Sequence, residues 1–572
     1  MKGIKPALLC LAALMFSCGS SLPAKEELIN VVLEKDETFQ AVTMHTSVKK
    51  GESAFFYISL SSGTVISEVS YPNYGVSKLK DYYLLELKDI RYPMVVKIGV
   101  SLQAIALHGE EETASVPKNL SHMRENAPGY KYAIAKQGYA QTGWEDDSGN
   151  FYGFGWRMPS SINDLYPHYE KEAAEESFGY SIREGGAVIE SAQSAGADLV
   201  IPSSIGGAPV REIASGAIHD DCVERLILPV TLASIEAGSI VSSSLKEITM
   251  YDDLGSVSDD SFSCPNLKTV NLLAVQDPAY SGTYWDVFQD KVDYLHSIKD
   301  DKKIVLFGGS SVRYGYCSPD IMENFPDYKV VNMGVYAYMN SSQQFEVVQT
   351  YLKEGDVIIF APEFDAVEHQ FFTSDEVDHH FFNCLESGYQ EAALLDLTKN
   401  ESFFDAYAQF HEVRSKLPRS SYKNAAKYYD DDMNAYSSDT YNVYGDMVFP
   451  RAGNAFEGRI SQVECDYLPS IISQSTFDSC NAHWDEIEAM GVKVLFNYAP
   501  KNIHCLTEAS TLEERNKLEA LINEKLDLPI MGELEESLYQ AKYFYLIDNH
   551  LTNDGARIHT EKLIANLKPL IA

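Results

Sequence analysis

Three short segments in the second half of the chain carry residues suited to ester chemistry. Ser310 follows two glycines, Gly334 ends the segment Val-Asn-Met-Gly, and His550 lies in the segment Asp-Asn-His-Leu-Thr. Each segment follows or includes a short apolar run that predicts a β-strand. The runs are residues 304–307, 330–331 and 543–547. Because open parallel sheets place their chemistry beyond the carboxyl ends of their strands, this pattern predicts a serine-nucleophile hydrolase.

Ester hydrolysis by a serine needs a base, a group that orients the base, and donors for the oxyanion. The glycines before Ser310 allow a sharp turn that exposes its hydroxyl and its backbone N–H. Gly334 can offer a second N–H with no side chain in the way. We expect His550 to act as the base and Asp548 to fix its tautomer. The predicted oxyanion donors are the N–H groups of Ser310 and Gly334.

In this order the segments resemble the SGNH (GDSL-type) hydrolases, and the resemblance covers residues 281–572. It implies that Ser310 is the nucleophile, Gly334 an oxyanion donor and His550 the base. The run from His550 through Gly555 and Thr560 is similar to acyl-transfer relatives that act on cell-wall and polysaccharide esters. The resemblance implies an acylated glycan or another ester as substrate, with no metal or organic cofactor.

The sequence departs from the family pattern at three places. Gly309 replaces the family's Asp, and Glu363 lies in the third block, where the family carries Asn. Asp548 precedes His550 by two residues rather than three, so Glu363 or Asp365 is a second candidate to orient the imidazole. These departures keep open an alternative function, a non-catalytic adhesion or glycan-binding protein with a degenerate SGNH fold.

Alternating apolar segments predict the elements that position these residues. A helix capped by Asn340, a strand over 356–360, a helix over 477–490 and a strand over 492–496 follow one another. This order predicts an α/β three-layer sandwich with a mostly parallel sheet. Residues 366–470 form a long polar insertion, a candidate lid or substrate wall. The capping-box residues 510–513 predict a further helix.

The first half of the chain predicts β-rich modules. Residues 24–108 alternate apolar and polar side chains and predict a small all-β module. Residues 109–172 contain Gly138-Tyr139, Gly143-Trp144 and Leu165-Tyr166 around an acidic glycine turn. That pattern resembles the Listeria–Bacteroides repeat of bacterial surface proteins. The chain as a whole is therefore predicted to be multidomain.

Residues 173–280 contain a repeat of 22 residues. The repeat relates three sets of apolar residues: Leu226, Ile248 and Val270; Ile213, Ile235 and Val257; Ile218, Ile240 and Phe262. Stacked units of this kind bury a continuous ladder of apolar side chains. The pattern resembles the BspA-like leucine-rich repeat. Such a short solenoid is either a spacer or a surface that binds a protein or a glycan.

The first 18 residues predict a bacterial signal peptide. A positive start and an apolar run precede Cys18, in a segment similar to the cleavage box of lipoproteins. The expectation is a protein lipid-anchored at Cys18 outside the cytoplasmic membrane, and an ordinary secretory signal is the alternative. The net charge of −37 argues against a nucleic-acid partner. Adjacent His379 and His380 lack metal-ligand spacing, so no metal site is predicted.

Overall fold

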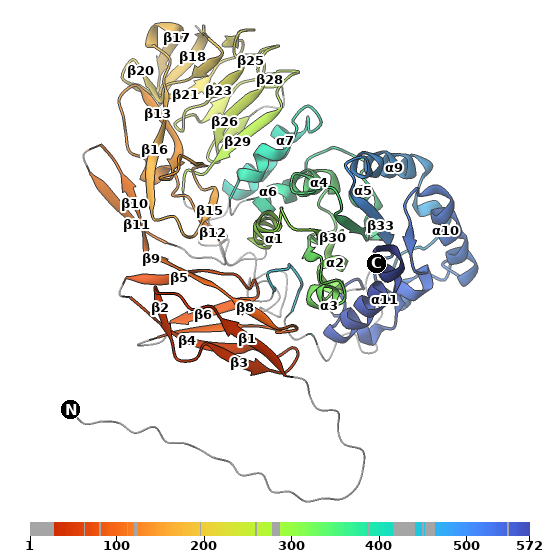
Figure 1. Cartoon of the computed structure of the whole chain (residues 1–572). Coiled ribbons are helices and arrows are strands. Elements are labelled where there is room, and N and C mark those ends of the chain that lie inside the picture. The colour runs from red at the N-terminus through yellow and green to blue at the C-terminus, as the bar shows by residue number, and fades with distance from the viewer. Residues whose placement is uncertain are drawn as a thin grey trace, which may run out of the picture.

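The computed structural model describes residues 28–571 (Figure 1). Within that range it leaves out residues 62, 79–81, 111, 119–123, 195, 258–259, 277–285, 386–387, 416–440, 449–450, 452–463 and 546–547. The predicted signal peptide and Cys18 lie outside the described residues. In the part of the chain that is described, no helix is long and apolar enough to cross a membrane.

The first module is built from short strands whose side chains alternate between a buried and an exposed face. In β4 this alternation buries Phe56 and Ile58 and exposes Phe55 and Tyr57. One sheet has the order β2-β4-β7-β6, a second has the order β3-β1-β8, and β5 pairs with β9. The strands are β1 Ile29–Leu33, β2 Phe39–Ala41, β3 His45–Val48, β4 Ala54–Leu60, β5 Thr64–Val69, β6 Tyr74–Lys78, β7 Tyr83–Leu87, β8 Met94–Val96 and β9 Ile98–Leu102.

The second module is a five-stranded sheet of order β11-β10-β16-β13-β14, with β12 paired to β15. Its strands are β10 Ala104–His108, β11 Thr113–Pro117, β12 Arg124–Asn126, β13 Tyr139–Glu145, β14 Phe151–Gly153, β15 Arg157–Pro159 and β16 Asp164–Lys171. Trp144 is fully buried, and its indole nitrogen donates to the Pro128 carbonyl at 2.8 Å. Trp144 and Phe154 therefore lie in the core of this module.

Residues 178–273 stack into mostly parallel ladders, which Figure 1 shows at the top of the molecule beside β13 and β16 of the second module. Leu226 lies beside Ile248, which in turn lies beside Val270 in the ladder β19-β23-β26-β29. Each step is the predicted 22 residues, so the repeat is confirmed as the structural unit. The strands are β17 Phe178–Arg183, β18 Gly186–Ala192, β19 Asp198–Val200, β20 Ser204–Ile205, β21 Ala208–Ile213, β22 Ile218–His219, β23 Arg225–Ile227, β24 Ser234–Ile235, β25 Ile240–Val241, β26 Glu247–Tyr251, β27 Ser256–Val257, β28 Phe262–Ser263 and β29 Thr269–Leu273.

The C-terminal part is an α/β domain around a five-stranded parallel sheet of order β31-β30-β32-β33-β35. Its sheet strands are β30 Lys303–Phe307, β31 Lys329–Asn332, β32 Val357–Phe360, β33 Lys493–Asn497 and β35 Ile530–Met531; β34 Lys501–Asn502 pairs with β36 Leu538–Tyr539. All residues of β30 and β32 are buried, as expected of strands covered on both faces. Helix α1 packs with α4, and α2 and α3 pack with α11.

The helices of this domain are α1 Asp286–Ser297, α2 Ser310–Gly315, α3 Ser318–Asn324, α4 Ser341–Gln349, α5 Val367–Gln370, α6 His379–Leu385, α7 Phe403–Ser415, α9 Gln474–Glu488, α10 Leu512–Lys525 and α11 Asn553–Ile571. The predicted cap is present, because the Asn340 side chain accepts from Ser342 N at 3.0 Å. The N-cap of α10 is Thr511, one residue after the first residue of the predicted capping box at 510–513. The expected alternation of strand and helix is therefore observed.

The strand order creates a switch point between β30 and β32. The chain runs from β30 to β31 on one side and then crosses to β32 on the other side. The connections that follow β30 and β32 therefore leave the carboxyl edge of the sheet toward opposite faces. Open α/β sheets bind their ligands at this position.

The predicted strand over residues 543–547 is wrong. Residues Ala541–Tyr543 form a turn of 3₁₀ helix, Phe544 makes an isolated bridge with Leu551, and residues 546–547 lie outside the described part. The apolar side chains here fill a small separate cluster of Tyr539, Phe544, Leu551 and Ala556. Burial in that cluster replaces burial in the sheet, and β35 is the outermost strand after β33.

The predicted insertion over residues 366–470 packs against the ladders through its described part. The Tyr407 hydroxyl in α7 donates to the carbonyls of Tyr251 and Leu254, each at 3.1 Å. Phe404 stacks on Phe262 with 4.2 Å between ring centroids. This part of the insertion therefore joins the α/β domain to the repeats.

Candidate functional site

Ser310 lies at the switch point as the first residue of α2, directly after β30 and two glycines. A side chain at Gly309 would meet Gln370 Nε2 at 2.4 Å and Glu363 Oε1 at 2.5 Å. Gly309 is therefore required because the loop after β32 approaches its backbone closely. The close approach brings Ser310 against Glu363, and both residues are buried.

The Glu363 carboxylate is the hydrogen-bond partner of Ser310. The Ser310 hydroxyl donates to Glu363 Oε1 at 3.3 Å, and the Ser311 N–H donates to the same oxygen at 2.7 Å. The Asn549 amide donates to Glu363 Oε2. Gln370 Oε1 accepts from the Glu363 backbone N–H at 2.9 Å. Three hydrogen bonds thus fix the Glu363 carboxylate and one fixes its backbone N–H, with Oε1 facing Ser310.

Glu363 titrates close to neutral pH in this setting. Burial, followed by the charge of Asp365, raises the pKa of Glu363 to about 7. The N–H of Ser311 and the charge of Lys501 oppose this rise. A carboxyl group with this pKa can accept a proton from Ser310 and return it at neutral pH.

A buried lysine and two aspartates lie next to Glu363. Lys501 Nζ contacts Asp365 Oδ2 at 3.0 Å and also pairs with Asp548. Burial alone would lower the pKa of Lys501, but the charges of Asp365, Tyr467 and Asp548 outweigh burial and raise it well above its ordinary value. Asn549 Nδ2 lies 3.3 Å from Asp365 Oδ2, which links the lysine group to Glu363.

The predicted pairing of Ser310 with His550 is not formed. The His550 ring stacks on Tyr314 with 3.8 Å between centroids and an interplanar angle of 7°. Among the described residues, neither ring nitrogen has a hydrogen-bond partner. Burial, followed by the charges of Arg313 and Arg451, lowers the pKa of His550 well below its ordinary value. His550 is therefore a neutral packing residue.

Asp548 does not orient His550 either, because its carboxylate pairs with Lys501. In the described part of this segment, Ala541–Tyr543 form a turn of 3₁₀ helix and Phe544 bridges to Leu551, so neither extends the sheet. The structure brings Asn549 to Ser310's partner and turns His550 toward α2.

The predicted oxyanion role of Gly334 is not supported by its contacts. Its N–H donates to Asn332 Oδ1 at 3.0 Å, and the Asn332 amide donates to the Val312 carbonyl at 2.9 Å. A side chain at Gly334 would lie 2.5 Å from the backbone nitrogen of Arg313. Gly334 is thus needed for the close packing of its loop against α2, and its N–H is already used.

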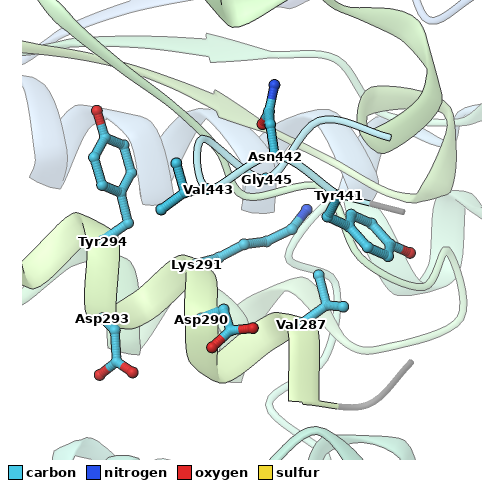
Figure 2. Close-up of a pocket in the computed structure, with 9 residues that line it drawn as sticks. All are labelled: Val287, Asp290, Lys291, Asp293, Tyr294, Tyr441, Asn442, Val443 and Gly445. Atoms are coloured by element: carbon cyan, nitrogen blue, oxygen red, sulfur yellow. The ribbon is translucent and has the colours of Figure 1, made fainter. Parts of the chain in front are cut away.

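Lys291 on α1 holds the loop that contains Gly334. Figure 2 shows Lys291 extending from α1 toward residues 441–445, while Asp293 points away from it. Lys291 is buried, and its ammonium group donates to the Gly334 carbonyl. Burial, followed by the charge of Arg313, lowers the pKa of Lys291 well below its ordinary value. This contact fixes the loop after β31 beside Ser310's helix.

Among Glu363, Asp365 and Asp548, it is Asp365 that reaches solvent. Asp365 is 18% exposed and lines a hollow of about 460 Å³. The hollow is lined by Phe364, Asp365, Val367, Glu368, Thr373, Ile471, Ser475, Thr476 and Ser479. Tyr338 is 45% exposed, and burial, followed by the charges of Asp365 and Glu363, raises its pKa. The distance between ring centroids is 5.4 Å from Tyr338 to Tyr336 and 5.6 Å from Tyr338 to His369.

Three residues of this group were missed by the sequence reasoning: Gln370, Lys501 and Asn549. Asn549 lies between two predicted site residues, so its position offered a signal. Lys501 follows β33 by a few residues, which is the edge where chemistry was expected.

The sequence predicted no metal site at His379 and His380. In the structure His380 pairs with Asp378 at 3.4 Å. Within the described ranges, no three His, Cys, Asp or Glu side chains gather as metal ligands would.

Comparisons with known proteins find similarity for only a small part of this chain. No protein-family model matches it, and no curated protein matches it. A crystal structure of a leucine-rich repeat protein from T. pallidum is similar over 18% of this chain and 64% of that chain. The identity is 22% and the TM-score 0.13. The strand pairing of the chain itself shows β-rich modules followed by an α/β domain with a parallel sheet.

Proposed function

We propose that residues 281–572 form an SGNH-like serine hydrolase or acyltransferase of O-acyl esters, in which Glu363 takes the place of His550 as base. One observation carries the proposal: Ser310 Oγ lies 3.3 Å from Glu363 Oε1 at the switch point of a parallel sheet. A nucleophile, a base with a pKa near 7 and fixed partners for that base are the parts that such chemistry needs.

The reaction would run in two steps. Ionised Glu363 accepts the Ser310 hydroxyl proton while Oγ bonds to the ester carbonyl carbon. The bond from that carbon to the alcohol oxygen then breaks, and Glu363 gives the proton to the departing alcohol. Water, or a second alcohol, attacks the acyl-serine with Glu363 again as base, which frees the acid or a new ester and restores Ser310. The predicted N–H donor of Ser310 would serve the oxyanion.

The proposed substrate is an acylated carbohydrate, by resemblance to the SGNH acyl-transfer relatives. The exposed ring of Tyr338 and the Asp365 carboxylate in its hollow both support a sugar, because an aromatic face suits C–H groups and carboxylates suit hydroxyl groups. We further propose that the first modules, with their Listeria–Bacteroides-like and BspA-like leucine-rich repeats, hold this domain outside the bacterial membrane. Lipidation at Cys18 would anchor it there.

A second candidate function is binding without catalysis. Two observations favour it: the Gly334 N–H is engaged by Asn332, and His550 is stacked away from Ser310. In that case the α/β domain would hold a glycan, at the hollow lined by Asp365, without cleaving an ester.

Ester turnover by the full chain separates the two candidates. We expect hydrolysis of p-nitrophenyl acetate or butyrate, with kcat/KM falling at least about 100-fold in Ser310→Ala and in Glu363→Gln. Ser537→Ala is the matched control, because it also removes a buried hydroxyl, one that donates to the Leu534 carbonyl. Turnover that survives Ser310→Ala contradicts the proposal. No turnover in any protein, together with tight glycan binding, favours the second candidate.

A further inference from the structure

A polar hollow lies far from Ser310, where the second module meets the ladder β19-β23-β26-β29. It has a volume of about 290 Å³. It is lined by Thr142, Phe151, His168, Glu170, Arg225, Ile227, Glu247, Thr249, Asn271 and Leu273. All these residues precede the α/β domain, so the hollow is independent of the proposed ester chemistry.

One wall of the hollow is aromatic. Phe151 on β14 is 40% exposed, although its ring is fixed by two neighbours. The ring makes edge contacts with His168, at 4.8 Å between centroids, and with Trp156, at 5.7 Å. A ring that is rigid and still exposed is a ready apolar surface for a ligand.

The opposite wall offers fixed hydrogen-bonding groups. Thr249 and Asn271 lie side by side on successive rungs of the ladder, one 22-residue repeat apart. Asn271 Nδ2 donates to Glu247 Oε1 at 2.6 Å and lies 3.4 Å from Thr249 Oγ1. The amide oxygen of Asn271 and the carboxylate of Glu247 are thereby oriented before any ligand arrives.

The cationic side chains around the hollow already have carboxylate partners. Arg225 contacts Glu170 at 2.6 Å and Asp198 at 3.1 Å. His168 Nδ1 lies 2.6 Å from Glu145. An anionic ligand would have to separate these pairs and leave a partly buried charge uncompensated, which is costly. The Glu247 carboxylate and the Asn271 amide oxygen accept hydrogen bonds from hydroxyl groups, so we expect a neutral ligand rich in hydroxyl groups.

We infer that this hollow binds a neutral carbohydrate, one or two sugar rings in size. The volume is near the lower end of small-molecule sites, which span about 300–1,000 Å³. The C–H face of the sugar would lie on Phe151, and its hydroxyl groups would meet Asn271 and Glu247. The repeats then act as more than a spacer, because they supply the polar wall.

The test uses the full chain and four neutral disaccharides: maltose, cellobiose, chitobiose and lactose. Saturation-transfer difference NMR detects binding, and titration of the strongest binder gives Kd. We expect Phe151→Ala and Asn271→Ala each to weaken binding at least about tenfold. Tyr166→Ala is the matched control, since Tyr166 is equally exposed at 40% on the same module but does not line the hollow; it should change Kd less than twofold.

Each outcome decides the inference. Binding that depends on Phe151 and Asn271 but not on Tyr166 supports it. No saturation transfer to any of the four sugars overturns it, as does binding that persists in both hollow variants. Ser310→Ala should leave Kd unchanged, so loss of ester turnover and loss of this binding can be told apart.

Discussion

Glu363→Gln should remove a pH dependence of stability that originates at the proposed catalytic base. The pKa of Glu363 is about 7 in the folded chain, against an ordinary value of 4.5. Because the folded pKa is raised, the folded state binds this proton more tightly, so its contribution is full below pH 4.5 and is lost as pH rises through 7. Integrated from pH 5 to pH 8, the loss is about 2–3 kcal/mol. Glutamine does not titrate, so the variant should gain that amount relative to the native chain.

Native-state hydrogen exchange followed by mass spectrometry can measure this change within the α/β domain alone. Peptides from β30 and β32 report the free energy of opening the sheet, whereas whole-chain melting would mix several domains. Glu391→Gln is the matched control, because burial and the charge of Asp293 also raise the pKa of Glu391 to about 7. Both variants should flatten the pH dependence, but only Glu363→Gln should abolish ester turnover. Equal pH slopes in the native chain and Glu363→Gln would refute the assignment of a near-neutral pKa.

Three further predictions concern the neighbouring residues and the repeats. His550→Phe should keep ester turnover within about threefold and leave the free energy of opening the sheet, measured by hydrogen exchange in β30 and β32, unchanged or higher, because it preserves the stack on Tyr314 and removes unpaired polar atoms. Lys501→Met should lower the same free energy by about 3–5 kcal/mol, because it leaves buried carboxylates uncompensated, and Lys501→Arg should recover part of the loss. Ile248→Ala, at the fully buried middle rung, should destabilise the repeats by about 2–5 kcal/mol, as seen by exchange in β23 and β29.

The sequence was most informative where the structure depends on local periodicity. The spacing of Leu226, Ile248 and Val270 predicts the register of the ladder, because each repeat must place its apolar side chain beside the same one in the next repeat. The same holds for the helix at Asn340, whose cap is a local interaction. Ser310 at the end of β30 also follows from a short apolar strand and two glycines.

The partner of Ser310 could not be predicted in the same way, because it depends on contacts between distant segments. Residues 543–547 carry a run of apolar residues suited to a strand, but Tyr543 and Phe544 pack in a separate cluster with Leu551 and with Ala556 of α11. That choice turns His550 toward Tyr314 and leaves Ser310 to Glu363, which follows β32. The order of the motifs predicted the edge of the sheet where Ser310 lies, but the predicted hydrogen-bond partner of its hydroxyl, His550, was wrong.

Labelling of Ser310 by a fluorophosphonate probe tests the central claim most directly. The full chain would be incubated with the probe at pH 5 and pH 8, and the modified residue identified by peptide mass spectrometry. The account predicts labelling of Ser310 that is faster at pH 8, is nearly absent in Glu363→Gln and persists in His550→Phe, since ionised Glu363 accepts the serine proton. Labelling that survives Glu363→Gln but disappears in His550→Phe would contradict it, as would a native chain that the probe does not label at either pH.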